Sequence, residues 1–578
     1  MTAPAARFGD NKHELQRWRQ RMALGLLFAG FGFLATRAVY LQAWHNDFLN
    51  EEGEKRVQRV VDIPAHRGII TDRRGEPLAV STPVESLWIN PRETNATPGQ
   101  IESMARLLGK DPAQLTRQIN DKTRGFVYLE RMVPPPLAAD VKALGITGLR
   151  SSPEYRRYYP AADVMAHVLG ITDINDQGRE GIELSYQSWL AGAPGKQRVI
   201  RDRPGNVVEV LERVKAPKPG RDLAISINQH IQYLAYRELS DAVVKHQAKA
   251  GAVVVLDART GEILALVNTP SYNPNSRATL DPTRVRNRAV TDLFEPGSTM
   301  KPMLVAAALD SGVVKPETRI DTGNGGFLVG DKVIRDVHAK GVVSIAEALQ
   351  VSSNVAVAKI ALDMKSEDYW RLLTQAGIGA PPKSGMPGEA SGRLRPYATW
   401  RPIEKATLAF GHGMSVSLLQ LAHAYTAFAN EGVMPPLTTL RRDAGVSGVR
   451  VMKPDTAKDV LRMLERVTQD GGTAPHARVA GYQVAGKTGT ARKLVNGAYA
   501  TKYISSFVGL APVSNPRLVV AVMLDEPGGK DYYGGLVAAP VFSRVMSGAL
   551  RFMAIPPDAS YDKNSAPPGG APVIPEAV

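Results

Sequence analysis

The feature that most constrains this chain is a run of fifteen uncharged residues, Met22–Thr36, close to its N-terminus. A helix rises about 1.5 Å per residue, so this run spans only about 22 Å of a hydrocarbon core roughly 30 Å thick. Apolar residues continue beyond Arg37 to Trp44, so we place Arg37 at the far interface, where its long side chain can reach water. The basic residues before the run favour a cytoplasmic N-terminus. We therefore predict a cytoplasmic basic tail at residues 1–21 and a transmembrane anchor at residues 22–44.

Size and composition bound the rest of the chain. At 578 residues the chain is too long for one core, and two or three folded units are expected. The absence of cysteine from the sequence excludes disulfides, thiolate metal sites and a cysteine nucleophile. The net charge of +15 suits either solubility or attraction to an anionic surface. No zinc-finger spacing or RNA-binding aromatic signature accompanies that charge, so we expect no nucleic-acid partner.

The chain changes character near a Pro/Lys-rich stretch at residues 215–222. Residues 45–220 are polar and loop-rich, with mixed strand and helix patterns, and form one predicted domain. Residues 221–555 form the second. It begins with a strand, a helix near Gln229–Lys249, and a hairpin whose apolar runs surround Gly261.

The second domain is predicted to be helical from about residue 298 to 480 and to end in strands. The connections between these last strands are too short for crossovers, so they indicate an antiparallel meander. A closing helix is predicted at Ala539–Ala554. Residues 556–578 are rich in Pro, Ala and Gly and are predicted to be a disordered tail.

Three short motifs occur in one order along this second domain: Ser298-Thr-Met-Lys301, Ser352-Ser-Asn354 and Lys487-Thr488-Gly489-Thr490. Ser298 follows a Pro-Gly break and opens an apolar run, so we expect it at a helix N-terminus. There the i,i+3 spacing places Ser298 and Lys301 on one face. Lys487 is predicted on the first strand of the meander, where the two glycines beside it would let a substrate backbone approach closely.

Each motif alone has little meaning, because each has a second match in this chain. The additional matches are Ser560-Tyr-Asp-Lys563, Ser226-Ile-Asn228 and Lys383-Ser384-Gly385. They fall in the predicted tail, on a strand at the domain edge and in a Pro/Gly loop. The first set of three, with its order and context, indicates a nucleophilic serine site.

The residue types in these motifs suit acyl transfer. A serine hydroxyl is a poor nucleophile until a base takes its proton, and Lys301 can do so if its surroundings keep its amine neutral. Lys487 and the helix terminus would supply the positive potential that favours the neutral amine. Ser352 can relay a proton to a leaving amine, and Asn354 can orient Lys301 and a substrate amide.

The last motif is expected to hold the substrate. Thr488 and Thr490, with Gly489 between them and Lys487 before them, suit the binding of a carboxylate. The backbone N–H groups of Ser298 and Thr490 would form an oxyanion hole, commonly the largest single contribution to such a reaction.

A phosphate-binding loop is the rival interpretation, because residues 481–488 also fit G-x-x-x-x-G-K-[ST]. Such a loop needs a buried strand before it and a helix after it. Here a poor strand precedes it and a hairpin at Asn496-Gly497 follows it, so we do not expect nucleotide hydrolysis. His338, His412 and His476 fit no Ser/His/Asp arrangement and no metal spacing, so we expect structural or surface roles for them and no metal or other cofactor.

The three motifs together resemble the fingerprint of the penicillin-binding protein transpeptidases. Five further segments of the second domain look like this family: residues 286–302, 411–432, 471–474, 484–492 and 532–542. Upstream, residues 67–81 and 180–186 look like the pedestal of the class B, monofunctional members, and no glycosyltransferase domain of the class A type is apparent. The details are most similar to the septal branch, the penicillin-binding protein 3 type.

The resemblance implies a mixed α/β fold: an antiparallel five-stranded sheet flanked by helices, on an elongated α+β pedestal. It also implies attack by Ser298 on the penultimate D-alanine of a stem pentapeptide, with release of terminal D-alanine, and then transfer of the acyl group to an amine of a neighbouring stem. β-Lactams, as mimics of D-Ala-D-Ala, would stay bound to Ser298. The implied setting is the inner membrane, with the catalytic domain in the periplasm at the division septum, beside a glycan polymerase of the SEDS family and other division proteins.

Other functions remain as alternatives. An elongation-type class B transpeptidase is the nearest, and a D,D-carboxypeptidase or a β-lactamase is more distant. A β-lactam sensor would bind covalently and signal instead of cross-linking, but the predicted cytoplasmic tail is too short for a signalling domain.

Overall fold

The computed structural model describes residues 11–41, 58–201, 207–276, 280–495 and 497–560. The chain divides into two compact units. The first comprises residues 1–65, 84–154 and 193–218, and the second comprises residues 66–83, 155–192 and 219–578. Segments 66–83 and 155–192 precede the predicted domain boundary at residue 220 yet pack with the second unit. The boundary itself stays a prediction.

The uncharged run lies within one long helix, α1 (Asn11–Val39). Its 22 residues Trp18–Val39 are long and apolar enough to cross a membrane, and their side chains are exposed. The guanidinium carbon of Arg37 lies 5.3 Å from the centroid of the Tyr40 ring, a pairing suited to a membrane interface. The helix is a candidate membrane span, as the sequence predicts. Residues 42–44 of the predicted anchor lie outside the described residues.

The first unit contains a three-stranded antiparallel sheet and a small core of strands and helices. The sheet has the order β1 (Gln58–Ile63), β6 (Gly195–Arg201), β7 (Val207–Lys215). The core is formed by β4 (Val127–Val133), α3 (Pro98–Leu108), α4 (Pro112–Asn120), α5 (Pro135–Ala143) and parts of β3 (Pro77–Ile89) and β5 (Leu149–Tyr158). Leu87, Met104 and Leu115 are fully buried there. Thr97 and Gln100 form a capping box that starts α3, and Gly109 ends it with a φ of +63°.

A five-stranded antiparallel sheet is the centre of the second unit. Its order is β10 (Ile263–Thr269), β9 (Ala250–Asp257), β19 (Leu518–Asp525), β18 (Ala498–Ala511), β17 (Ala485–Val495). Every residue of β9, β10 and β19 is buried, because helices cover both faces of the sheet. This architecture confirms the predicted mixed α/β class, the β9–β10 hairpin and the final meander.

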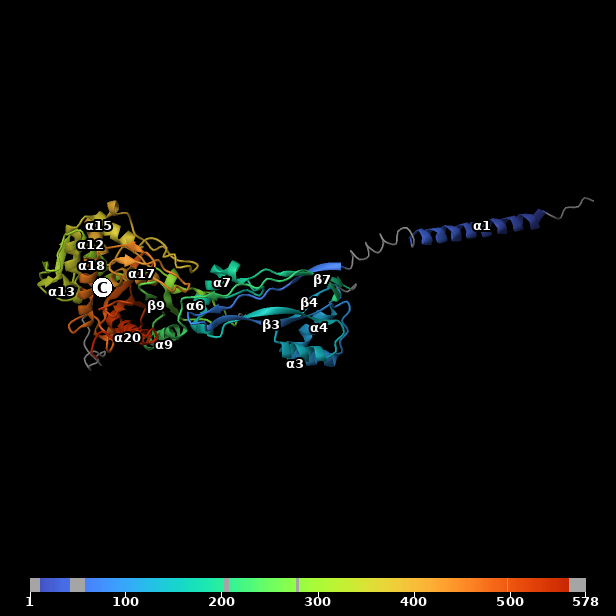
Figure 1. Cartoon of the computed structure of the whole chain (residues 1–578), viewed down its shortest axis with the longest axis horizontal. Coiled ribbons are helices and arrows are strands. Elements are labelled where there is room, and N and C mark those ends of the chain that lie inside the picture. The colour runs from blue at the N-terminus through green and yellow to red at the C-terminus, as the bar shows by residue number, and fades with distance from the viewer. Residues whose placement is uncertain (1–10, 42–57, 202–206, 277–279, 496, 561–578) are drawn as a thin grey trace, which may run out of the picture. The chain divides into compact units, whose positions relative to one another are not determined.

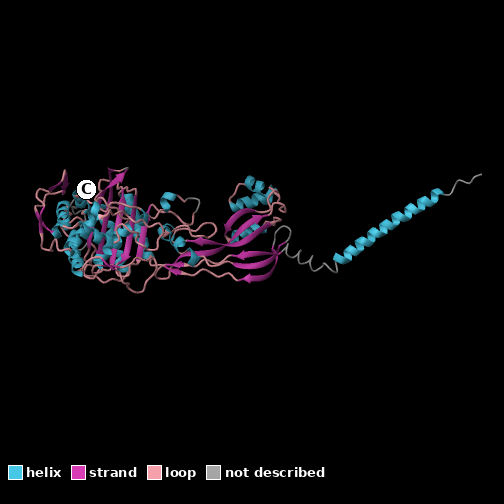
Figure 2. Ribbon diagram, turned by 90° about the horizontal axis from the view of Figure 1, so that it is seen from above, coloured by secondary structure: helices cyan, strands magenta, loops and turns pink. Residues whose placement is uncertain are grey.

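Helices α9 (Gln229–Lys245) and α20 (Ala539–Phe552) pack against each other and the sheet, while α17 (Leu418–Ala429) packs on β9 and β19. Figure 1 shows α17 and the α9–α20 pair on opposite sides of β9. Figure 2 shows strands of this unit running beside one another, with helices next to them. All twelve residues of α17 are buried, so this helix forms the middle of the core.

Besides α12 (Lys301–Asp310), the second unit contains further helices. They are α6 (Ala166–Leu169), α7 (Gly181–Ser185), α8 (Gln187–Leu190), α10 (Pro282–Val285), α11 (Arg288–Thr291), α13 (Ile345–Gln350), α14 (Asn354–Asp363), α15 (Ser366–Gln375), α16 (Pro402–Leu408), α18 (Pro454–Glu465) and α19 (Gly534–Val537). Short strands accompany them: β2 (Ile70–Thr71), β8 (Leu223–Ala224), β11 (Arg319–Asp321), β12 (Gly326–Val329), β13 (Lys332–Arg335), β14 (Val342–Ser344), β15 (Val433–Met434) and β16 (Val449–Arg450).

Three local predictions differ from the structure. The region predicted as helical contains the β12–β13 hairpin, which turns at Gly330-Asp331, a dipeptide suited to a two-residue loop. Helices α9 and α20 end four and two residues earlier than expected. The predicted tail begins at residue 556, but Asp558 accepts hydrogen bonds from the backbone N–H groups of Gln483 (2.7 Å) and Ser514 (3.0 Å), so its first residues are docked. The rest of the tail, and Asn496 of the predicted turn, lie outside the described residues.

Candidate active site

Ser298 lies on a short 3₁₀ turn, η4 (Gly297–Met300), that runs directly into α12. The first turn is therefore 3₁₀ rather than the expected α-helix. Gly297 has a φ of +59°, and a Cβ there would lie 3.4 Å from the Cβ of Ala491 on β17. The turn thus brings Ser298 close to the edge strand of the sheet.

The hydroxyl of Ser352 joins the two lysines of the motifs. Lys301 Nζ donates to Ser352 Oγ at 3.0 Å and also to the backbone oxygen of Ser352. Lys487 Nζ donates to the same Oγ at 2.9 Å and to Thr488 Oγ1 at 3.2 Å. Both lysines are 0% exposed, and Ser298 is 5% exposed. The fold therefore brings together residues from three motifs that are far apart in the sequence.

The second motif sits at the start of α14 in a constrained backbone. Ser352 has a φ of +62°, which is uncommon for a residue with a side chain. Ser353 caps the helix by accepting from the N–H of Ala356 at 3.0 Å. Asn354 donates its Nδ2 to the backbone oxygen of Arg335 at 3.2 Å, and its Oδ1 is buried without a hydrogen-bond partner among the described residues.

Asp336, which the sequence analysis did not single out, holds this motif in place. Its Oδ2 accepts from the hydroxyl of Ser353 at 2.6 Å, and its Oδ1 accepts from the N–H groups of Asn354 (2.6 Å) and Val355 (3.0 Å). Charged hydrogen bonds of this kind are the strong ones. A carboxylate at the start of a helix is also favoured by the helix dipole. Asp336 follows directly after the β12–β13 hairpin, and no local sequence pattern marks it as a partner of this motif.

The two glycines beside Lys487, Gly486 and Gly489, are required by the protein's own packing. A Cβ on Gly489 would lie 2.6 Å from Ser506 Oγ and 2.9 Å from Thr299 Cγ2. A Cβ on Gly486 would lie 2.5 Å from the ring of Phe507. These glycines let β17 lie against its neighbours, and the expected room for a substrate backbone stays a prediction. A substrate-binding role for Gly489 stays a prediction.

The threonines of β17 are fixed by neighbours that the sequence did not reveal. Thr488 Oγ1 is 2.9 Å from Thr473 Oγ1, and Thr490 Oγ1 accepts from the N–H of Gly534 at 3.0 Å. Among the described strands, β17 pairs only with β18, so its other edge is unpaired. An unpaired strand edge with ordered hydroxyl groups can bind an extended peptide.

A second group of polar residues lies beside the nucleophile. Glu295 accepts from the N–H of Gly413 at 2.8 Å and from the hydroxyl of Tyr499 at 2.9 Å. Burial, with a smaller contribution from the Glu295 carboxylate, raises the pKa of Tyr499 to about 12, so this phenol remains a donor. Burial lowers the pKa of His412, against the opposing effect of Glu295. His412 was expected to be structural or on the surface, and its ring packs against Phe410 with centroids 5.2 Å apart.

The rival interpretations of the motifs fail on their surroundings. Lys487 and Thr488 lie inside strand β17, so no helix N-terminus follows them and no phosphate-binding loop is formed. The hydroxyl of Ser226, from a second motif match, donates to the backbone oxygen of Ile263 at 2.7 Å within the core. Ser560 is exposed, and Lys563 lies outside the described residues.

Family models match both parts of the chain. Residues 251–547 match the penicillin-binding protein transpeptidase domain, and residues 62–225 match the penicillin-binding protein dimerisation domain. The chain belongs to the penicillin-binding protein transpeptidases. This membership confirms the family and the enzyme class, a serine acyltransferase, that the sequence predicts.

Known proteins similar to this member of the family include two curated relatives and a solved domain. A probable peptidoglycan D,D-transpeptidase, PenA of Neisseria meningitidis serogroup A, is 44% identical over 93% of this chain and 92% of its own length. The peptidoglycan D,D-transpeptidase FtsI of Escherichia coli K12 is 40% identical over 95% of this chain and 94% of its own. The TP domain of penicillin-binding protein 3 from Burkholderia pseudomallei, solved without ligand, is 46% identical. It covers 58% of this chain and 98% of its own, with a TM-score of 0.54.

Proposed function

We propose that this penicillin-binding protein cross-links peptidoglycan at the division septum through an acyl-enzyme on Ser298. The observation that carries the proposal is the hydroxyl of Ser352, which accepts hydrogen bonds from the buried amines of both Lys301 and Lys487. A buried amine next to a second amine is favoured in its neutral form. The two nitrogens are no more than about 6 Å apart, which is close enough for that effect.

In the first step, Lys301 acts as the base. Its neutral amine takes the proton of Ser298 Oγ, which attacks the carbonyl carbon of the penultimate D-alanine of a stem pentapeptide. The N–H groups of Ser298 and Thr490 stabilise the oxyanion that forms. The C–N bond then breaks, and the proton returns through Ser352 to the amine of the departing D-alanine.

In the second step, an amine of a neighbouring stem attacks the acyl-enzyme. Its proton passes to the same lysine–serine pair, the new amide forms the cross-link, and Ser298 is restored. A β-lactam enters as a mimic of D-Ala-D-Ala and stays bound, because its opened ring does not leave the site.

The remaining motif residues bind and orient the peptide in this account. Lys487, Thr488, Gly489 and Thr490 hold its terminal carboxylate. The buried, unpartnered Oδ1 of Asn354 supports a role in accepting a substrate amide N–H, because buried oxygens in folded proteins are almost always hydrogen-bonded.

The setting of the enzyme is also part of the proposal. The basic residues before α1 favour a cytoplasmic N-terminus, with both folded units in the periplasm. We propose the inner membrane at the septum as its location, and a SEDS-family glycan polymerase with other division proteins as its partners. The name FtsI of the Escherichia coli relative supports the septal branch over the elongation-type alternative.

Labelling with a fluorescent penicillin tests the nucleophile. We expect wild-type protein and Ser560→Ala to be labelled equally and Ser298→Ala not at all, with the adduct mapping to the peptide that contains Ser298. Ser560→Ala is the matched control because Ser560 begins the other S-x-x-K match. Labelling that persists in Ser298→Ala would remove the assignment. Midcell fluorescence of a tagged full chain is expected, and an even distribution along the lateral wall would favour the elongation role instead.

A further inference from the structure

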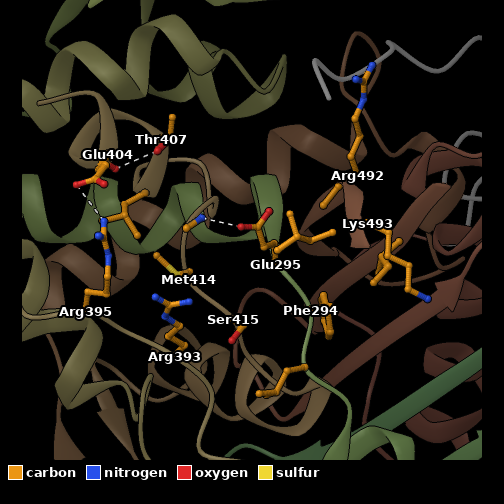
Figure 3. A pocket seen from close by; sticks show the side chains of 16 residues that line it. Phe294, Glu295, Arg393, Arg395, Glu404, Thr407, Met414, Ser415, Arg492 and Lys493 are labelled. Atoms are coloured by element: carbon orange, nitrogen blue, oxygen red, sulfur yellow. Dashed lines mark hydrogen bonds and ion pairs between the residues drawn. The ribbon is translucent and has the colours of Figure 1, made fainter. Parts of the chain in front are cut away.

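Two pockets of the second unit differ in kind. One belongs to the active-site region, and Figure 3 shows that Glu295 and Arg393 are among the side chains that line it. The other, of about 750 Å³, lies between α9 and α20 and shares no lining residue with the first. We call this second pocket the α9–α20 groove. No residue of the three motifs lines it, so the proposed reaction does not account for it.

The groove forms where the two helices touch. A Cβ on Gly548 of α20 would lie 2.1 Å from Leu234 Cδ2 of α9, so the helices are in contact there. The rings of His230 and Phe552, which line the groove, stack with their centroids 5.4 Å apart. Tyr233 is 56% exposed and Phe552 is 38% exposed. The groove therefore offers aromatic surface to a ligand.

Positive charge gathers at the rim of the groove. Arg237 pairs with Glu238 at 2.7 Å, and Arg544 binds the same carboxylate. The guanidinium of Arg551, which lines the groove, forms no salt bridge within the part of the chain that the structure describes. Two arginines thus share one acid and a third has none, so the groove favours a ligand with an acidic group.

A segment of the same chain has the complementary chemistry. The sequence Pro-Val-Ile-Pro-Glu occupies residues 572–576, beyond Ser560, where the described residues end. Two prolines three residues apart form a pattern that aromatic-lined grooves bind, because proline rings fix φ and lower the entropy lost on binding. Glu576, directly after the second proline, supplies the acid that the rim favours.

The chain is long enough for this segment to reach the groove of its own molecule. Phe552, which lines the groove, stands eight residues before Ser560, so their Cα atoms lie at most about 29 Å apart. From Ser560 to Pro572 the chain advances by twelve residues, which can span up to about 40 Å. The connection is therefore longer than the gap that it has to cross.

We propose that residues 572–576 bind in the α9–α20 groove and so dock the tail of the chain on the second unit. The apolar pair between the two prolines packs against Tyr233 and Phe552. Glu576 pairs with Arg551, whose planar guanidinium matches a carboxylate in two hydrogen bonds. A weak contact is sufficient, because a short tether keeps the segment at an effective concentration on the order of millimolar.

Disulfide trapping in the full-length protein in detergent tests this proposal, because the chain has no cysteine of its own. Val573→Cys is combined either with Val164→Cys, which lines the groove, or with Val244→Cys, which lies on α9 outside the lining. Val244 is 78% exposed, so simple access favours this control pair. Under mild oxidation we expect the groove pair to form its disulfide at least about tenfold faster than the control pair.

An exchange of charges locates the contact. Arg551→Glu is expected to lower the ratio of the two rates to less than about twofold, because it places two carboxylates together. Glu576→Arg added to the same chain should restore the ratio to at least about fivefold, since the pair is then reversed. Arg462→Glu, at an exposed arginine outside the groove, should keep the wild-type ratio. Each ratio compares two cysteine pairs in one background, so a loss of stability does not imitate it.

Three outcomes would overturn the proposal. Equal rates for the two cysteine pairs would show that the segment does not prefer the groove. A disulfide that joins two chains, and forms faster at higher protein concentration, would assign the groove to a second copy of the protein. A ratio that Arg551→Glu leaves unchanged would remove the contact with Glu576 and with it the assigned position of the segment.

Discussion

Two pairs of buried basic side chains in the second unit are held in different ways. Arg67 and Arg157 bind opposite oxygens of one carboxylate, that of Glu183, at 2.7 and 2.6 Å, and all three residues are almost fully buried. Lys301 and Lys487 instead bind one hydroxyl, that of Ser352. The first cluster is built around a full negative charge, and the second is built around a neutral, exchangeable proton.

Burial therefore serves stability in the cluster of Arg67, Arg157 and Glu183, and it serves chemistry in the cluster of Lys301, Lys487 and Ser352. Arginine stays protonated in proteins, so a buried pair of arginines needs a carboxylate, and removing that partner is costly. Lysine can release its proton when it is buried, which makes it suitable as a base. We therefore expect changes in the arginine cluster to affect folding, and changes in the lysine cluster to affect the reaction rate.

The largest effect is expected from Glu183→Gln. It leaves two guanidiniums buried without their carboxylate, which should lower the free energy of unfolding by about 3–5 kcal/mol. The measurement is the thermal midpoint of the detergent-solubilised chain. Glu180→Gln is the matched control, because Glu180 is exposed and its replacement should change stability by less than about 0.5 kcal/mol. Equal midpoints for the two variants would show that Glu183 is not what compensates the arginines.

Asp176 adds a pH dependence to the same cluster. Its backbone oxygen accepts from Arg67 at 3.0 Å, and burial raises the pKa of its carboxyl from 3.8 to about 6, although both arginines oppose this. The raised pKa means that ionisation costs the folded state more than the unfolded state. The cost is absent below about pH 4, grows as the pH rises to about 6, and is full above that.

Asp176→Asn should therefore stabilise the protein by up to about 3 kcal/mol at pH 7.5 and have no effect near pH 4. Asparagine also suits the φ of +60° at this position. Unfolding by urea at the two pH values measures this. A loss of stability at pH 7.5 would mean that the arginines need Asp176 as a second counter-ion. The arginine cluster would then be built around two carboxylates and not around Glu183 alone.

Asp336 is a carboxylate, like the centre of the arginine cluster, but it positions the lysine cluster. Asp336→Ala should slow acylation by a fluorescent penicillin about 10- to 100-fold, since it releases the start of α14 and with it Ser352. Asp336→Asn should be intermediate, because its oxygen can still accept from the backbone N–H groups of Asn354 and Val355. Asp331→Ala, in the exposed turn of the same hairpin, is the control and should acylate at the wild-type rate. An Asp336→Ala variant as fast as this control would show that the motif holds its shape alone.

The smallest effect is expected where an ion pair is exposed. Arg401→Ala removes a 3.0 Å contact with Glu404, but the Arg401 side chain is 75% exposed and Arg395 remains bound to the same carboxylate. The thermal stability should change by no more than about 0.5 kcal/mol. A change as large as that of Glu183→Gln would indicate that burial is not what distinguishes the ion pairs of this protein.

The sequence was sufficient for what depends on local pattern. Apolar runs and short connections predicted the β9–β10 hairpin and the meander of β17, β18 and β19. Spacing and order predicted that Ser298, Ser352 and Lys487 belong to one site, and the fold brings the three motifs together. The family resemblance supplied the roles, which stay predictions until they are tested.

The sequence could not reveal partners that meet only in the folded chain. Glu183 lies 116 residues from Arg67, and a lone glutamate in a short helix carries no sign of such a contact. Asp336 lies 17 residues from Ser353, in a region whose helical pattern concealed a hairpin. The packing reason for Gly489 was also hidden, because its close neighbours Thr299 and Ser506 come from other elements.

The most direct test of the central claim is the second-order rate constant for acylation of Lys301→Met by a fluorescent penicillin, measured beside its thermal midpoint. Methionine keeps the bulk of the side chain and removes only its amine. We predict a rate at least about 100-fold below wild type, with a midpoint no lower. A rate within tenfold of wild type, or a rate lost only together with a collapse of the midpoint like that expected for Glu183→Gln, would contradict it.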